Sequence, residues 1–105
     1  MKTIEIRDSK DRRYTLKVNT DDIKKEVKDG QTSWEIEHEV WTDGEGRVGF
    51  GHFSASCTQE HDHLPDEKII EALISLGREK VIADINNERD IESKGYNIHI
   101  TDCTQ

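Results

Sequence analysis

The stretch from residue 34 to residue 41 constrains the fold of this chain more than any other feature. Apolar side chains and a histidine alternate there with acidic side chains and a tryptophan. The first set is Trp34, Ile36, His38 and Val40, and the second set is Glu35, Glu37, Glu39 and Trp41. Because successive side chains of a β-strand point to opposite faces, the alternation predicts a half-buried strand with the first set in the core.

The residues that follow predict a hairpin. The sequence Asp-Gly-Glu-Gly at 43–46 is typical of a turn, and alternation resumes after it. We expect a three-residue loop, which places Val40 opposite Val48 and His38 opposite Phe50. This register gathers the most apolar residues on one face of the hairpin.

The other predicted elements follow from periodicity and from residues typical of helix ends. Apolar residues alternate over two segments before the hairpin and one near the C-terminus. They recur at helical spacing after Pro65, and Gly77 predicts a break between two helices. Thr20 and Gly30 are typical of the two ends of a short helix. The predicted elements are strands 2–7, 14–18 and 96–100, a short helix within 20–30, and helices 65–76 and 78–93.

This order of elements, β-β-(α)-β-β-α-α-β, predicts an α+β fold. We expect a small antiparallel or mixed sheet of about five strands, with the two C-terminal helices packed on one face. Residues 1–105 form a single predicted domain, since no linker or repeat divides them. Hydrophobic residues make up only 31% of the sequence. We therefore expect a thin core and a modest stability, which a metal or a homo-oligomer would increase.

The charge of the chain excludes some classes of function. Lysine and arginine number 15 and aspartate and glutamate 23, so the formal net charge is −8. Proteins that bind nucleic acid concentrate positive charge, so direct nucleic-acid binding is not expected. No apolar run is long enough to span a membrane. Residues 1–50 have a net charge of −2 and residues 51–105 one of −6, and this asymmetry favours a partner with a basic surface.

The first residues and the two cysteines bear on the compartment. The segment MKTIEIRDSK becomes charged too early for the apolar core of a signal peptide. We therefore expect a cytoplasmic protein with reduced thiols. Cys57 and Cys103 would form a disulfide only in an oxidising compartment.

A cluster of histidines and one cysteine is the candidate metal site. His52, Cys57, His61 and His63 fall within twelve residues, and imidazole and thiolate are good zinc ligands. His38 is a substitute ligand, because the predicted hairpin places it beside His52. The spacing H-x4-C-x3-H-x-H matches no established zinc pattern. The alternative is that the loop histidines are solvated and that His38 is a packed, hydrogen-bonded core residue.

The sequence contains no recognisable catalytic motif. It has no nucleophile elbow, no P-loop and no glycine-rich motif that opens a helix. Cys57 with His52 or His61 would make a nucleophile and a base, but no third residue can be assigned to orient the base. We therefore do not expect an enzyme.

The acidic positions of the first strand of the hairpin predict a binding surface. Glu35, Glu37 and Glu39 form a row on the exposed face, spaced about 6.8 Å apart, and Trp41 ends the row. Such a face would bind a basic partner, with Trp41 as an aromatic anchor. The alternative is an ordinary solvated face with Trp41 covered by a helix or a loop.

These observations favour a non-enzymatic acidic interaction protein. It would occlude a basic surface of a partner protein, in the manner of small bacterial or phage inhibitors and immunity proteins. The alternative is a zinc-binding domain, structural or hydrolytic, that uses the cluster at residues 52–63. A third interpretation is a small-ligand binder with a pocket between protomers, lined by Trp34, Phe50 and Phe53.

Overall fold

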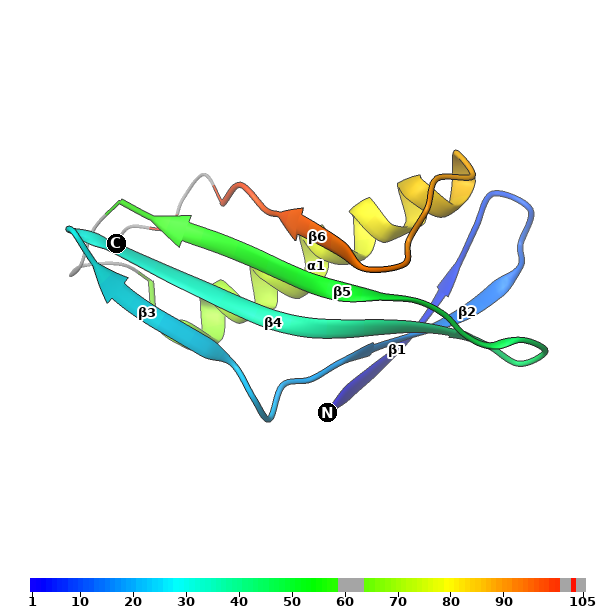
Figure 1. Cartoon of the computed structure of the whole chain (residues 1–105), viewed down its shortest axis with the longest axis horizontal. Coiled ribbons are helices and arrows are strands. Elements are labelled where there is room, and N and C mark those ends of the chain that lie inside the picture. The colour runs from blue at the N-terminus through cyan, green and yellow to red at the C-terminus, as the bar shows by residue number, and fades with distance from the viewer. Residues whose placement is uncertain (59–63, 101–102, 104–105) are drawn as a thin grey trace.

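One sheet and one long helix make up the described part of the chain (Figure 1). The computed structural model describes residues 1–58, 64–100 and 103. Its strands are β1 (Lys2–Arg7), β2 (Arg13–Val18), β3 (Lys24–Lys28), β4 (Gln31–Thr42), β5 (Gly46–Cys57) and β6 (Lys94–Asn97). Its helix is α1 (Asp66–Asn86), which lies between β5 and β6 in the chain. The α+β class is confirmed, whereas the two predicted C-terminal helices are one.

β4 is the strand around which the sheet is built. The strand order is β1-β2-β4-β5-β6, and β3 also pairs with β4. β2 pairs with the second half of β4 and β3 with the first half, so both lie along one edge of it. The described pairs are antiparallel except that of β5 with β6, which is parallel. A parallel pair needs a long crossover connection, and α1 provides it across one face of the sheet (Figure 1).

The core lies between α1 and the face of the sheet that it covers. The side chains that meet there are almost fully removed from solvent. They include Leu16, Val18, Trp34, Ile36, Val40, Phe53, Ile69, Leu73 and Val81. His38 is buried in the same layer, with 2% of its surface exposed. The inward positions of β4 are therefore those that the alternation predicts.

α1 passes through Gly77 without a break. Its buried side includes a row of residues spaced by four, namely Ile69, Leu73, Gly77, Val81 and Ile85. A Cβ atom on Gly77 would lie 2.8 Å from the ring of Phe53, so glycine lets the helix approach β5 closely. The predicted break was wrong, because Gly77 serves a contact between helix and sheet and does not end the helix.

Residues 20–30, predicted as a short helix, contain β3 instead. Asp29 and Gly30 have positive φ values of 53° and 75°, and they join β3 to β4 with Lys28 opposite Gln31. Two consecutive residues of positive φ are typical of the tight hairpin turn that an Asp-Gly pair favours. The helix prediction was wrong, because Gly30 closes a hairpin and does not follow a helix.

A bulge changes the register of the β4–β5 hairpin. The three-residue loop is as predicted, but the register shifts by one residue between Val40 and Trp41. Val40 therefore lies opposite Gly49, and His38 lies opposite Gly51. The cross-strand neighbours predicted for both residues were wrong, because a bulge adds one residue to β5 and carries no simple sequence signal.

The shift exchanges the two faces of β5. Phe53 now points into the core, and His52 lies on the face away from α1. Glycine at position 49 leaves room for the segment after α1, since a Cβ atom there would lie 2.7 Å from Cγ1 of Ile91. His38 and His52 are consequently on opposite faces of the sheet, so the prediction that they lie side by side was wrong.

Cys57 and Cys103 form a disulfide bond, with their Cα atoms 6.0 Å apart. Cys57 ends β5 and is buried, and the backbone N–H of Leu64 donates to the carbonyl of Cys103 at 2.8 Å. The bond differs from the reduced thiols expected from the sequence, while the cytoplasmic location stays a prediction. In the described ranges, no helix has the length and apolar character that a membrane span requires.

Candidate functional site

The face of the sheet opposite α1 carries the residues predicted to bind a partner. No described helix or strand packs over this face (Figure 1), and we call it the open face. Its central side chains come from β2, β4 and β5. They are Lys17, Glu35, Glu37, Glu39, Trp41, Arg47, Phe50 and His52.

The three carboxylates of the predicted row lie along β4 on the open face. Glu39 accepts a hydrogen bond from Nη1 of Arg47, at 3.1 Å from its Oε2. The Oε1 atom of Glu35 lies 3.6 Å from Nε2 of His52. Glu37, between them, is exposed and makes no ion pair among the described residues. It is therefore the carboxylate of the row that is most available to a cation from outside.

Two aromatic rings on the open face hold cations of the same chain. Nζ of Lys17 lies 4.2 Å from the ring centroid of Trp41, and Cζ of Arg47 lies 4.6 Å from that of Phe50. Trp41 is half-buried, and what lies over it is this lysine. Arg47 stacks on a ring and binds Glu39 at the same time. These pairs are of the cation–π kind, which contributes about 0.5–1 kcal/mol at an exposed site.

A hollow of about 520 Å³ opens on this face. All three carboxylates of the row line it, together with Phe50 and His52. Phe50 and His52 were not predicted to face the carboxylates, because the predicted register lacked the bulge. Lys17, Arg47 and Met1 line it as well, so the hollow is a concavity in which carboxylates, cations and an aromatic ring lie together.

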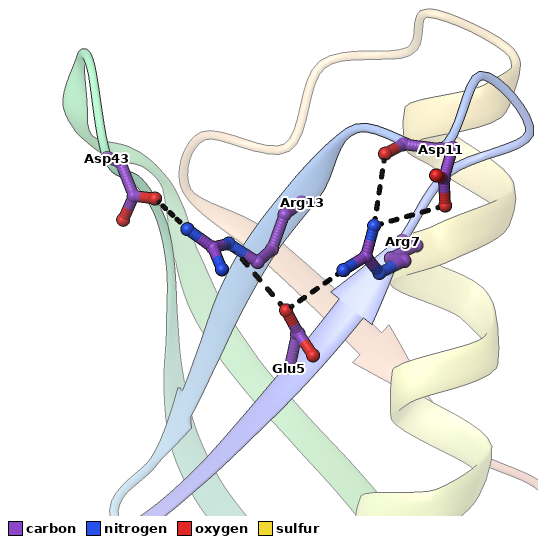
Figure 2. Close-up of polar contacts among 5 residues, drawn as sticks. All are labelled: Glu5, Arg7, Asp11, Arg13 and Asp43. Carbon is purple, nitrogen blue, oxygen red and sulfur yellow. Dashed lines mark hydrogen bonds and ion pairs between the residues drawn. The ribbon is translucent and has the colours of Figure 1, made fainter.

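At one end of the sheet, a chain of ion pairs joins the β1–β2 hairpin to the β4–β5 turn. Figure 2 shows its members, which alternate in charge: Asp43, Arg13, Glu5, Arg7 and Asp11. Arg13 lies 2.6 Å from Asp43 and 3.6 Å from Glu5, and Arg7 lies 3.5 Å from Glu5 and 3.1 Å from Asp11. The hydrogen bond with Asp43 raises the pKa of Arg13. Exposed pairs of this kind add little stability, but they neutralise both arginines locally.

The candidate zinc ligands are not brought together in the described part of the chain. His52 lies on the open face, whereas Cys57 and His38 lie on the covered face. The sulfur of Cys57 is bonded in the disulfide, and His61 and His63 lie outside the described residues. Within the described ranges, no three His, Cys, Asp or Glu side chains are arranged to hold a metal ion. The zinc site stays a prediction.

Comparisons with known proteins assign no family to this chain. No protein-family model matches it, and neither a curated protein nor a solved structure matches it. The geometry of the open face therefore carries the functional interpretation.

Proposed function

We propose that this protein is a non-enzymatic interaction module that binds a basic surface of a partner protein through the open face. Exposure alone would not support this, since an antiparallel sheet often has one face in water. The observation that carries the proposal is the hollow, where a row of three carboxylates meets an exposed aromatic ring. Carboxylates provide charge complementarity to a basic surface, and aromatic rings are frequent anchors of interfaces.

Arg47 indicates which group of the partner the open face would hold best. Its guanidinium stacks on Phe50 and binds Glu39, so the chain itself provides an example of the contact. Glu37 lies one position along the same row and lines the same hollow. An arginine of the partner would bind Glu37 by a charge-assisted hydrogen bond and pack its planar group beside Phe50.

The mechanism follows from the charge and the size of the molecule. A net charge of −8 on 105 residues attracts a basic surface over a distance of about one Debye length, which is about 10 Å at moderate salt. The bound module then occludes that surface, as an inhibitor or a regulator does. Steering of this kind acts on the association rate, which falls steeply as the salt concentration rises.

The experiment is an affinity capture from the host lysate with two charge-matched double variants, read by mass spectrometry. Glu35→Gln with Glu37→Gln removes two charges from the open face. Glu71→Gln with Glu79→Gln removes two charges from exposed positions of α1. We expect one partner with a basic surface that is captured by the wild type and the α1 variant and lost with the open-face variant.

Two results would contradict the proposal. One is a partner captured equally by both variants, which would place the binding surface elsewhere. The other is an association rate for the captured partner that stays constant between about 50 and about 500 mM salt, because a steered encounter must weaken as salt screens the charges.

A further inference from the structure

His38 lies at the centre of β4, directly beneath the open face. Its neighbours along the chain, Glu37 and Glu39, point to the open face, and its own ring points into the core. Only 2% of His38 is exposed. Both ring nitrogens are buried without a hydrogen-bond partner in the described residues. This is unusual, because buried polar groups are normally hydrogen-bonded.

The ring of His38 packs as if it were an apolar aromatic ring. It lies flat on Phe53, with centroids 4.2 Å apart and an angle of 5° between the planes. The ring of Tyr96 is tilted against it at 5.7 Å. Across the strands its neighbours are Val18 and Gly51. A neutral imidazole fits these surroundings, whereas a charged imidazolium would lose its hydration without gaining a counter-ion.

The charged groups nearby do not provide that counter-ion. From β6, Tyr96 donates its hydroxyl to Oδ2 of Asp84 at 2.7 Å. Asp84, on α1, is thereby engaged, and it also lies 3.6 Å from both Arg89 and Lys94. From β5, the other titratable group is His52, a second potential cation on the opposite face. No described carboxylate is bonded to the His38 ring.

We propose that His38 makes the open face sensitive to acid, because a proton on its ring breaks the stack with Phe53 and Tyr96 and loosens the strand that carries Glu35, Glu37 and Glu39. The link to partner release rests on the function proposed above. The link to stability rests only on the packing of the ring and needs no partner.

The direction of the pH dependence follows from the surroundings of the ring. Burial, and then the charge of His52, lower the pKa of His38 from 6.5 to about 4. The unfolded chain therefore binds a proton at this residue at a higher pH than the folded chain does. The contribution of neutral His38 to stability is therefore complete above pH 6.5 and is lost as the pH decreases towards 4. Between neutral pH and pH 4, the folding equilibrium constant falls by about 100-fold through this residue.

The test compares urea unfolding across this pH range for the wild type, His38→Phe, His38→Leu and His99→Gln. His99 is exposed, so its variant is the matched control. In the wild type and the control, we expect the folding equilibrium constant to fall by about 100-fold between neutral pH and pH 4. Both His38 variants should lack this fall. Equal pH dependence in all four proteins would overturn the proposal.

A second measurement covers the case in which neither His38 variant folds. The ring protons of His38 in the wild type are followed by NMR against pH. A midpoint near 4 supports the proposal, and a midpoint at the ordinary histidine value overturns it.

Binding of an oligo-arginine peptide is then measured in acid and at neutral pH for the wild type and for a His38 variant that folds. A larger loss of peptide affinity in acid for the wild type supports coupling between His38 and the open face. An equal loss in both proteins overturns that coupling. If the peptide binds at neither pH, the proposed function fails, while the unfolding and NMR results still decide the role of His38.

Discussion

The two faces of the sheet are built from different interactions, although their side chains alternate along the same strands. The covered face consists mainly of fully buried apolar side chains such as Ile36 and Phe53, with His38 buried among them. The open face consists of charged and aromatic side chains held by ion pairs and cation–π contacts. Burying apolar surface stabilises by about 25 cal/mol per Å², whereas an exposed ion pair contributes about 1 kcal/mol or less. The covered face is therefore expected to contribute most of the stability, and the open face very little of it.

The substitution Phe53→Ala is expected to reduce the stability of the covered face most. Phe53 is fully buried, contacts Gly77 of α1 and stacks on His38. Its removal leaves a cavity, and we expect the free energy of unfolding to fall by about 4 kcal/mol in urea denaturation. A loss below about 1 kcal/mol would show that the covered face does not dominate stability.

Reduction of the disulfide is expected to have the next largest effect. The bond joins residues separated by 46 positions, a segment that contains α1 and β6. Opening such a loop lowers stability by roughly 3 kcal/mol, measured as urea unfolding with and without a reductant. The double variant Cys57→Ala with Cys103→Ala should not respond to the reductant, and a wild type that does not respond either would contradict the prediction. In the cytoplasm predicted from the sequence, thiols are kept reduced, so the protein there would have the lower stability.

The substitution Arg47→Ala has the smallest expected effect on stability and a distinct effect on binding. It removes an exposed ion pair with Glu39 and a stack on Phe50, so the free energy of unfolding should fall by about 1 kcal/mol or less. Because Arg47 covers the ring beside which a partner arginine would pack and neutralises Glu39, its removal should raise the affinity for an oligo-arginine peptide in calorimetry. A loss of affinity would contradict this account of the hollow.

Local patterns predicted the hairpin strands β4 and β5 and the position of the carboxylates, but they missed β3 and the contacts between distant elements. The alternation of β4 placed His38 in the core and Glu37 on the exposed face. Gly77 and Gly30 were misread, because a glycine can end a helix, close a hairpin or allow a close approach. Only the partner across the fold, such as Phe53 against Gly77, distinguishes these roles.

The candidate site was predicted in part for the same reason. The carboxylate row follows from the periodicity of a single strand. Phe50 and His52 were assigned to the wrong face, because one extra residue in β5 reverses every side chain after it. Among the described residues, the His38 ring has no hydrogen-bond partner, and the hydroxyl of the neighbouring Tyr96 donates to Asp84; no local pattern predicts either feature.

The most direct test of the open face as a binding surface is a map of backbone amide chemical shifts as the oligo-arginine peptide, or the captured partner, is added. We expect the shift changes to cluster on β4 and β5 around Glu37, Phe50 and His52. We also expect Glu37→Gln to reduce these changes and Glu79→Gln to leave them as they are. Changes confined to α1, or unaffected by Glu37→Gln, would contradict the claim that the open face is where this protein binds.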